Sequence, residues 1–462
     1  MKPENIRKLF GTDGIRGESG KFPLDSRTVR IIGRSLAGHL SKRTHGRAPR
    51  IVIGRDTRES GVWIEQDLVA GARSEGTEVE SAGIITTPGI AFLARTLPAD
   101  AGVVISASHN AYQDNGIKVF EPSGRKLDEG AERDIEKDVV DALPETAGSA
   151  KNNPEADIAE RSPTDLRRLY LDYLAHDVAH GLSLEHLTMV VDCANGAAWE
   201  IAPQLFERLG ARVVAINNQP DGRNINRECG SLHIEGLQHR VLQERADLGV
   251  AFDGDADRVL FVDSGGRFVD GDATLWVLAN YLERRGELID DTVVATVMSN
   301  IGLEVALRSR GIKLTRTDVG DKYVLDELLR IGATLGGEQS GHIIFPKLSL
   351  AGDGIITAIG LLRAMRDQAS SLAELTEDFK RYPQLLVNVR VREKLPFDDL
   401  PAVQNLAEKV EQELGDRGRL LLRYSGTEPL ARVMIEGESQ SQIESQANAL
   451  AEAIKTELGA DD

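Results

Sequence analysis

Helical and extended patterns of apolar residues alternate along most of this chain. Between residues 26 and 43, apolar side chains recur every three or four positions, which predicts a helix that begins at a cap, Asp25 or Ser26. A similar helical pattern lies near 61–75. Short apolar runs that predict strands lie among such segments, at 51–53, 103–105, 190–192 and 293–297. The alternation predicts the α/β fold class.

Polar stretches with proline or glycine divide the chain into four predicted domains. One covers residues 142–165, a second break lies near 263–266, and a third lies near 381–383. After the third break the pattern changes to strands followed by one long helix. We therefore predict three α/β domains of related topology and a smaller C-terminal α+β domain. The predicted bounds are 1–164, 165–265, 266–382 and 383–462.

Composition and charge narrow the classes of partner. Hydrophobic residues make up 41% of the 462 residues and charged residues 28%, which excludes disorder as the dominant state. Lys and Arg number 55 against 73 Asp and Glu, so the formal net charge is −18. This balance argues against a nucleic-acid or anionic-membrane partner, because both need a basic surface. An anionic substrate would need local Arg, Lys, metal or backbone N–H groups.

Cysteine usage and hydropathy indicate the compartment. The chain contains two cysteines, Cys193 and Cys229, too few for a disulfide framework and without a Cys-x-x-Cys pair for zinc. The first eight residues carry charge where a secretory signal needs an apolar stretch. No apolar run approaches the roughly 20 residues that span a bilayer. We expect a cytoplasmic protein with no membrane partner.

A metal site is predicted at Asp253, Asp255 and Asp257, which lie between two apolar runs. Carboxylates at alternate positions can converge on one cation, and oxygen-only ligands favour Mg²⁺ or Ca²⁺ over zinc. An EF-hand is excluded, because Arg258 and Ser264 stand where that motif needs Gly and Glu. The alternative is a solvated acidic turn. The flanking apolar runs disfavour it, since three crowded carboxylates without a cation repel one another.

A second polar loop, 106–110, follows the apolar run at 102–105 directly and contains Ser108 and His109. A hydroxyl at the carboxyl end of a strand occupies the place where α/β folds carry reacting groups. A serine-hydrolase elbow is disfavoured, because it needs glycine two residues to either side of its serine. A polar capping turn is the alternative interpretation of this loop taken alone.

The turn around Gly426 has the composition of a phosphate-binding loop. Glycine permits exposed backbone N–H groups, and Ser425 and Thr427 add hydroxyl donors. Arg423 can bind a phosphate through two parallel hydrogen bonds, and Arg432 follows on the next predicted strand. The chain contains no Walker A motif. Taken alone, an ordinary hairpin turn explains this segment about as well.

Two further glycine-containing loops carry polar side chains. One presents Glu338, Ser340 and His342, which can hydrogen-bond sugar hydroxyls, although a simple turn is again the alternative. The other, at 11–17, delivers Arg16 from a glycine-rich bend and is not a dinucleotide fingerprint. The four main polar loops fall one to each predicted domain. Four structural turns of such composition together are improbable, so we predict that the loops meet in a cleft between domains.

Together these motifs resemble those of the α-D-phosphohexomutase superfamily over essentially the whole chain, in the order 11–17, 106–118, 253–258, 336–342 and 423–429. The resemblance implies four domains around a deep central cleft. Gln339 and the loop 319–324 are most similar to the branch that interconverts glucosamine 6-phosphate and glucosamine 1-phosphate, feeding UDP-N-acetylglucosamine and cell-wall synthesis. Mutases of glucose or mannose phosphates are the alternative within the superfamily.

The resemblance also implies a mechanism. Ser108 would be a phosphoserine in the resting enzyme, and one Mg²⁺ per chain would be bound by Ser108, Asp253, Asp255 and Asp257. The small-molecule phosphosugar would pass through glucosamine 1,6-bisphosphate, or be primed by glucose 1,6-bisphosphate. The catalytic candidates are Ser108, His109, Lys118, Arg258 and His342, with the acid and base left unranked. The expected substrate-binding residues are Arg16, Lys322, Glu338, Ser340, Arg423, Ser425, Gly426, Thr427 and Arg432.

The chain departs from the superfamily pattern at two positions. Ala111 stands where proline commonly follows Ser-His-Asn, and Lys322 replaces the more usual Arg, which keeps the charge but loses the planar fork. The competing classes are a hydrolytic phosphatase and a non-catalytic sugar-phosphate sensor. Dimers are common in the superfamily, so a homodimer is an expectation, although no stretch of this sequence identifies an interface.

Overall fold

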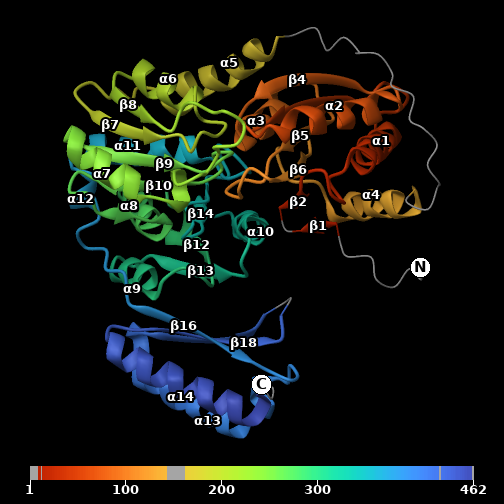
Figure 1. Cartoon of the computed structure of the whole chain (residues 1–462). Coiled ribbons are helices and arrows are strands. Elements are labelled where there is room, and N and C mark those ends of the chain that lie inside the picture. Colours follow the sequence, from red (N-terminus) through yellow and green to blue (C-terminus); the bar gives the residue numbers. More distant parts are fainter. Residues whose placement is uncertain (1–8, 12, 143–161, 426–427, 460–462) are drawn as a thin grey trace.

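The computed structural model describes residues 9–11, 13–142, 162–425 and 428–459. Within these ranges the chain forms four units, domains I to IV, each built on its own β-sheet (Figure 1). The predicted linker 142–165 falls mainly on residues 143–161, which lie outside the described part of the chain.

Domain I holds the first sheet, drawn red to orange in Figure 1. The strands run in the order β1-β2-β6-β5-β3-β4 and are β1 (Phe10–Gly11), β2 (Gly14–Glu18), β3 (Arg50–Arg55), β4 (Glu78–Ile84), β5 (Ala101–Ile105) and β6 (Asp114–Phe120). The helices are α1 (Ser26–Arg43), α2 (Ser60–Arg73), α3 (Thr87–Thr96) and α4 (Glu129–Ala142). Helix α1 confirms the predicted range, and its cap is Asp25, whose side chain accepts a hydrogen bond from the N–H of Thr28.

Both faces of this sheet are buried, which explains the unbroken apolar runs in its strands. Ile51 and Ile53 of β3 belong to the core beneath α1 and α2, whereas Val52 between them belongs to a separate core with α3. The side chains alternate because successive residues of a strand point to opposite faces.

Domains II and III hold the next two sheets. Domain II contains β7 (Thr188–Asp192), β8 (Arg212–Ile216), β9 (Leu248–Phe252), β10 (Val259–Asp263), β11 (Phe268–Val269), α5 (Pro163–Tyr173), α6 (Ile201–Arg208) and α7 (Glu235–Glu244). Domain III contains β12 (Thr292–Thr296), β13 (Lys313–Thr317), β14 (Leu335–Gly337), β15 (Ile343–Ile344), α8 (Gly271–Arg284), α9 (Ile301–Ser309), α10 (Asp321–Ile331), α11 (Gly354–Gln368) and α12 (Leu372–Leu375). The predicted break at 263–266 is a hairpin turn, because β10 and β11 pair antiparallel in one sheet.

Domains I, II and III share one strand order, which confirms the predicted related topologies. In each, the first parallel strand lies between the second and third, and a fourth strand pairs antiparallel with the third. The shared orders are β4-β3-β5-β6, β8-β7-β9-β10 and β13-β12-β14-β15. The third-to-fourth connection leaves the carboxyl end of a parallel strand, where α/β folds bind ligands. It carries the 106–110 loop in domain I, the aspartate loop in domain II and the Glu338–His342 loop in domain III.

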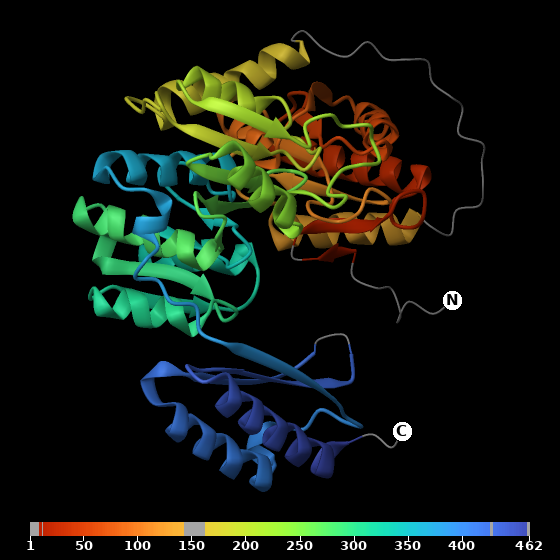
Figure 2. The same cartoon turned by 60° about the vertical axis from the view of Figure 1, so that its left-hand side comes forward.

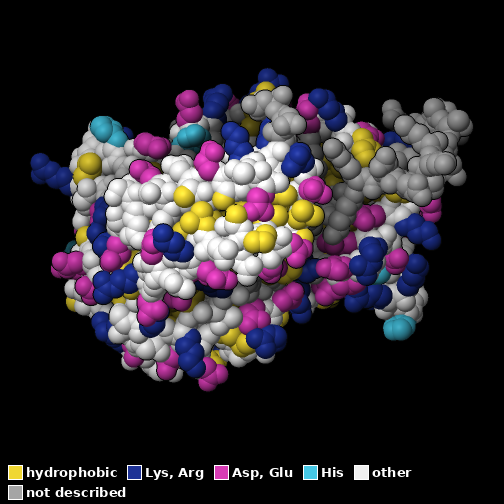
Figure 3. All heavy atoms as spheres, turned by 90° about the horizontal axis from the view of Figure 1, so that it is seen from below, with side chains coloured by type: hydrophobic (Ala, Val, Ile, Leu, Met, Phe, Trp, Pro, Cys, Tyr) yellow, Lys and Arg dark blue, Asp and Glu magenta, His cyan; other side chains and the backbone are white. Residues whose placement is uncertain are grey.

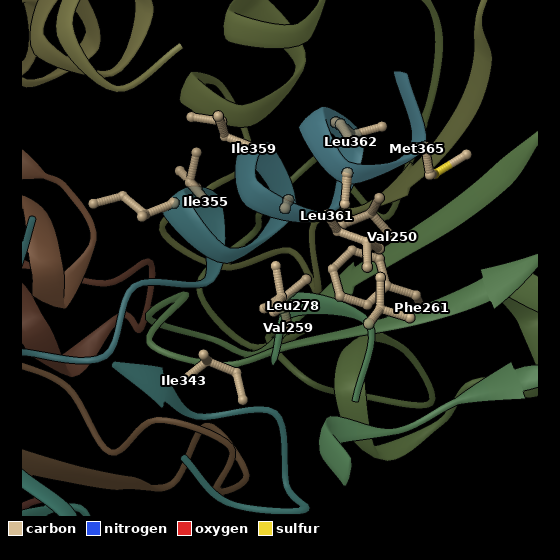
Figure 4. Packing of buried hydrophobic residues seen from close by; sticks show 14 of the residues in the cluster. Val250, Val259, Phe261, Leu278, Ile343, Ile355, Ile359, Leu361, Leu362 and Met365 are labelled. Atoms are coloured by element: carbon tan, nitrogen blue, oxygen red, sulfur yellow. The ribbon is translucent and has the colours of Figure 1, made fainter. Parts of the chain in front are cut away.

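Domains II and III share a continuous hydrophobic core, centred on α11 and α8. Figure 4 shows Leu361 of α11 lying over Val250 of β9 and Phe261 of β10, with Leu278 of α8 beside Val259. Burial of this apolar surface holds the two sheets in a fixed relation. The loops at the ends of β9 and β14 therefore keep a constant spacing.

Domain IV confirms the predicted C-terminal α+β domain. Its strands run in the order β16-β18-β17 and its elements are β16 (Gln384–Arg390), α13 (Pro401–Leu414), β17 (Arg419–Tyr424), β18 (Leu430–Glu436) and α14 (Gln440–Leu458). The helices cover the sheet face turned away from domains I to III, and the other face turns toward them (Figures 1 and 2).

Seen from the domain IV end, acidic and basic side chains are interspersed over the surface (Figure 3). Among the described helices, none combines the length and the apolar composition needed to cross a bilayer.

Candidate active site

Loops from domains I, II and III meet at one point of the structure. Ser108 Oγ donates a hydrogen bond of 2.6 Å to Asp253 Oδ2. Lys118 Nζ donates to Asp255 Oδ2 at 2.8 Å, and His342 Nδ1 lies 3.7 Å from Asp257 Oδ1. Residues far apart in the chain are thus brought together, and the predicted meeting of these three loops is observed.

Ser108 is held in an unusual backbone conformation. Its φ is +52°, in the left-handed region that most residues avoid, and its side chain is buried. Its N–H donates to Ser106 Oγ at 2.9 Å, and its carbonyl accepts bonds from Arg58 Nη2 at 3.0 Å and Asn226 Nδ2 at 2.9 Å. Because the surrounding groups fix this conformation, the hydroxyl is aimed at Asp253.

Arg58 is the main support of this loop, and the sequence analysis missed it. It is fully buried and paired with Asp56, whose Oδ2 also accepts from Ser106 Oγ at 2.7 Å. Its guanidinium donates to the carbonyls of Ser108, Asn110, Ala111 and Asp114. The available signal was an Asp-x-Arg sequence directly after the apolar run at 51–53, at the carboxyl end of a predicted strand.

Asp253, Asp255 and Asp257 form a buried group that fits a divalent cation. Each offers a carboxylate oxygen, and these oxygens lie within 4.8 Å of one another. Within the described structure, Oδ1 of Asp255 and of Asp257 are buried without a hydrogen-bond partner, although buried carboxylate oxygens are normally satisfied. Burial, followed by the charges of Asp257 and Asp255, raises the pKa of Asp253 well above its usual value. An all-oxygen set with unsatisfied acceptors suits Mg²⁺.

Gly254 allows this loop to approach Ser108. A Cβ at this position would lie 2.5 Å from the Ser108 carbonyl oxygen and 2.9 Å from Asn226 Nδ2. No side chain fits there without separating the aspartate loop from the 106–110 loop.

Lys118, on β6, points into the aspartate group. It is 1% exposed and lies 3.1 Å from Asp13, 2.8 Å from Asp255 and 3.2 Å from Asp257. Burial alone would lower the pKa of Lys118, but these three carboxylates raise it well above the usual value. Lys118 is therefore a cation here and neutralises the carboxylates around it.

His109 has the opposite electrostatic setting to Lys118. Its Nδ1 lies 2.8 Å from Arg258 Nη1 and 3.3 Å from Ser108 Oγ. Burial, then the charges of Arg258 and Arg16, lower the pKa of His109 to about 4. A neutral imidazole beside the serine hydroxyl can accept a proton at neutral pH.

His342 is charged in this arrangement. Burial acts to lower its pKa, but the carboxylate of Asp257, 3.7 Å from Nδ1, together with the charge of Asp321, raises the pKa to about 9. Its Nε2 lies 3.7 Å from Asp321. The structure thus separates a neutral His109 from the cationic His342 and Lys118.

The loop between β14 and β15 presents Glu338 at the edge of this centre. Glu338 is half-buried and accepts from the N–H of Gly320 at 3.1 Å, while the exposed Ser340 donates to Glu338 Oε2 at 3.4 Å. The Gln339 side chain instead donates to Asp272 Oδ2 at 3.0 Å. Gln339 therefore fixes the β14–β15 loop to Asp272 of α8.

Arg16 and Lys322 lie at the margin of the centre. Arg16 pairs with Asp13, and its Nε has no hydrogen-bond partner in the described part of the chain. Lys322 pairs with Glu129 of α4. This pair joins domain III to domain I, so in this structure the Lys322 ammonium is directed to Glu129.

The predicted phosphate loop belongs to domain IV. Arg423 of β17 lies directly opposite Arg432 of β18, and the buried Ser425 offers its carbonyl to Lys394 at 2.5 Å. Gly426 and Thr427 lie outside the described residues. No hydrogen bond or ion pair between described residues links Arg423, Ser425 or Arg432 to Ser108, so the predicted convergence is seen for three loops and not for the fourth.

Comparison with protein families identifies the class. Residues 7–143 match "Phosphoglucomutase/phosphomannomutase, alpha/beta/alpha domain I", 168–266 match domain II, 270–382 match domain III and 386–453 match the C-terminal domain. The chain belongs to the phosphoglucomutase/phosphomannomutase family. The predicted resemblance is confirmed, and with it the prediction of a phosphohexomutase enzyme.

The chain is also similar, over nearly its whole length, to individual proteins named phosphoglucosamine mutase. The chain is 48% identical to the phosphoglucosamine mutase of Solibacter usitatus, over 98% of this chain and 99% of that protein. It is 48% identical to that of Koribacter versatilis (98% of both chains) and 43% identical to that of Chlamydia trachomatis serovar D (99% of both).

Solved structures show the same fold. A phosphoglucomutase/phosphomannomutase family protein from Burkholderia thailandensis superposes with a TM-score of 0.77 at 24% identity, covering 98% of both chains. An Aspergillus fumigatus N-acetylphosphoglucosamine mutase, solved with GlcNAc-6P and magnesium, gives a TM-score of 0.65 at 19% identity, covering 98% of this chain and 96% of that one.

Proposed function

We propose that this enzyme interconverts glucosamine 6-phosphate and glucosamine 1-phosphate, and so supplies UDP-N-acetylglucosamine synthesis. The observation that carries the proposal is the hydrogen bond from the strained, buried Ser108 to Asp253 within the cation-fitting aspartate group. The full-length likeness to proteins named phosphoglucosamine mutase supports the amino-sugar substrate. Cys193 and Cys229 are buried and unpaired, which supports a reducing cytoplasmic location.

Ser108 is the proposed phosphoryl carrier. In the forward reaction the bond between Ser108 Oγ and phosphorus breaks, and the phosphoryl group bonds to a free hydroxyl of the bound sugar phosphate. The sugar then carries two phosphates, as a 1,6-bisphosphate. After the intermediate reverses its orientation, the bond between the original phosphoryl group and its sugar oxygen breaks, and this group bonds to Ser108 Oγ. The sugar oxygen takes up a proton, and the isomerised monophosphate is released.

Asp253, Asp255 and Asp257, with a phosphate oxygen on Ser108, would hold one Mg²⁺. When bound, this ion supplies positive charge that stabilises the transferring phosphoryl group. Arg258 lies in contact with His109, beside Ser108, and would add a guanidinium on the same side.

Proton transfer is assigned from the electrostatic settings of the two histidines. His109, with its lowered pKa, would accept the proton of the attacking hydroxyl. His342, whose pKa is raised to about 9, would act as the proton donor, and Lys118, whose pKa is raised well above its usual value, would act as a fixed cation. Each turnover transfers one phosphoryl group from Ser108 to the sugar and another from the sugar to Ser108, so both a proton acceptor and a proton donor are needed.

The remaining predicted residues would bind the sugar and its second phosphate. Glu338 and Ser340 would accept and donate to hydroxyls, and Arg16 and Lys322 would act at the margin. The distal phosphate would be held by Arg423, Ser425, Gly426, Thr427 and Arg432. Since Arg423 and Arg432 lie on domain IV, binding requires this domain to move toward domains I to III.

Intact-protein mass spectrometry and kinetics test the proposal together. We expect the wild type to carry a single phosphoryl group at Ser108, and Ser108→Ala to lack both this group and all mutase turnover while keeping the wild-type circular dichroism spectrum. Retained turnover in Ser108→Ala would remove Ser108 as the carrier. Release of inorganic phosphate in place of isomerisation would indicate a phosphatase.

Side-by-side kinetics on the 6-phosphates of glucosamine, glucose and mannose test the substrate. We expect the highest kcat/KM on glucosamine 6-phosphate. A preference for either of the other sugars would contradict the amino-sugar assignment and leave the transfer chemistry intact.

A further inference from the structure

Six charged side chains form a closed ring beside the aspartate group. Oppositely charged neighbours alternate around it, and domains I, II and III all contribute. In order around this charged ring, the members are Asp13, Lys118, Asp257, His342, Asp321 and Lys126.

Half of the ring consists of residues already placed at the site. Lys118 Nζ lies 3.1 Å from Asp13 Oδ2 and 3.2 Å from Asp257 Oδ2. His342 Nδ1 lies 3.7 Å from Asp257 Oδ1. The side chains of Lys118, Asp257 and His342 are 1%, 6% and 6% exposed.

The other half is formed by Asp13 and by Lys126 and Asp321, two residues that have no assigned role. Lys126 Nζ lies 2.6 Å from Asp13 Oδ1 in its own domain and 2.6 Å from Asp321 Oδ2 in domain III. Asp321 Oδ2 in turn lies 3.7 Å from His342 Nε2. Lys126 and Asp321 are 23% and 18% exposed, so solvent screens their attraction only in part.

The His342 ring is also restrained by packing. A Cβ on Gly352 would lie 2.1 Å from His342 Nε2, so the imidazole rests directly on this glycine. With Asp257 at Nδ1, Asp321 at Nε2 and Gly352 against the ring, the imidazole has little freedom to rotate.

We propose that Lys126 and Asp321 are positioning residues of the transfer reaction. Their ion pair joins domain I to domain III and holds the His342 ring in place beside Asp257. This inference rests on the proposed function, since it assigns them to the same centre. His342 Nε2 has no hydrogen-bond partner among the described residues, so Asp321 acts through its charge, which at 3.7 Å favours the ring orientation that places a cationic imidazole between two carboxylates. Lys126 fixes that carboxylate in turn, because it bridges Asp321 to Asp13.

Simple docking of the two domains is the competing explanation, and the chain contains a matched control for it. Arg125 directly precedes Lys126 in the chain, and Asp326 lies on α10, the helix that begins at Asp321. Arg125 Nη2 lies 2.8 Å from Asp326 Oδ1. This pair joins the same two segments but is 44% and 46% exposed, and among the described residues neither side chain forms a hydrogen bond or ion pair with a side chain of the charged ring. Substitutions at Arg125 and Asp326 therefore weaken docking without touching His342.

Steady-state kinetics form the first arm of the test, on the Mg²⁺-loaded enzyme with glucosamine 6-phosphate. We expect Asp321→Asn and Lys126→Met each to lower kcat about 10–100-fold, as loss of a supporting partner does. KM should change less than about threefold, because an interaction needed only for the chemical step is removed. Lys126→Arg should recover most of the rate, and Arg125→Met and Asp326→Asn should stay within about twofold of wild type.

Nuclear magnetic resonance of the histidine rings forms the second arm, which needs no turnover. The chain has nine histidines, and the His342 signal is identified by its loss in His342→Gln. We expect this ¹³Cε1 signal to shift in Asp321→Asn and Lys126→Met and to stay in place in Asp326→Asn.

An unmoved His342 signal in both ring variants, or an equal loss of kcat in the Arg125 and Asp326 controls, would overturn the inference. If the wild type itself fails to isomerise the sugar, the proposed function fails, and the ring signals still decide whether Lys126 and Asp321 position His342. If Lys126→Met does not fold, Asp321→Asn with Lys126→Arg completes both arms.

Discussion

Ser108 and Asp253 are joined by a 2.6 Å hydrogen bond although 145 positions separate them in the chain. Each lies in the connection between the third and fourth strands of its own sheet, β5 to β6 in domain I and β9 to β10 in domain II. The contact therefore arises from two copies of one topology that present equivalent loops to each other.

Loss of one aspartate should remove the response to magnesium. In Asp255→Asn we expect kcat to fall about 10²–10³-fold, because charge stabilisation of the transferring group is lost. Added Mg²⁺ should raise the melting temperature of the wild type, since a ligand that binds only the folded state stabilises it, and should not raise that of the variant. Differential scanning fluorimetry over a magnesium titration measures this. The exposed Asp177→Asn is the control, and an unchanged magnesium response in Asp255→Asn would show that the cation binds elsewhere.

The close approach of the aspartate loop to the 106–110 loop, which Gly254 allows, should be essential for activity. In Gly254→Ala the new Cβ meets the Ser108 carbonyl at 2.5 Å, so the two loops must separate. We expect kcat to fall about 10²-fold or more, because displacement of reacting groups by about 1 Å has this effect. Gly38→Ala in α1, where nothing lies within 4 Å of the added Cβ, should keep full activity. Near-normal kcat in Gly254→Ala would mean that the observed spacing is not required.

Asp272 should make stability depend on pH. Burial, then the charge of Asp270, raises the pKa of Asp272 to about 7 from its ordinary 3.8. Between about pH 4 and pH 7 the unfolded chain has released this proton while the folded chain retains it, so the wild type loses stability as the pH rises through this window. Asp272→Asn should escape this loss and show a higher melting temperature than wild type at pH 8, with a smaller difference at pH 4.5. The exposed Asp378→Asn should track the wild type, and an Asp272→Asn difference that does not grow with pH would contradict the assignment.

Glu436 should anchor domain IV. It is fully buried, pairs with Arg419 at 2.8 Å, and accepts bonds from Asn300 Nδ2 at 3.1 Å and the Ile301 N–H at 3.2 Å. Glu436→Leu removes the acceptor of the Asn300 and Ile301 bonds and leaves Arg419, whose side chain is 16% exposed, without its carboxylate partner, which should destabilise the contact with domain III by about 3–5 kcal/mol.

Limited proteolysis measures this contact, because a loosened domain IV is cut from the chain faster. Glu438→Gln, which removes a carboxylate 42% exposed, is the control and should be cut at the wild-type rate. Equal cutting of Glu436→Leu and wild type would show that the buried carboxylate does not hold the domain.

Much of the fold could be predicted from the sequence, because its signals are local. The helix 26–43 and its cap Asp25 follow from apolar spacing and one side chain. The short apolar strands and the α+β change after residue 383 follow from the same periodicities. The aspartate trio and the serine loop can be recognised in the sequence because several reactive side chains lie within a few positions of one another.

The class of fold, the family and the loops that carry chemistry thus follow from local patterns in the sequence. The individual side chains that join these loops emerge only from the three-dimensional arrangement. Asn226 at the Ser108 carbonyl and Lys126 in the charged ring are isolated polar residues without a local pattern, whereas Arg58 and Asp321 lie in recognisable segments that do not reveal their partners. The pairing of Lys322 with Glu129 likewise depends on how domain III lies against domain I. Hydrophobic periodicity is read within one helix or strand, whereas a buried ion pair is set by which sheets lie side by side, and no short stretch of sequence records that.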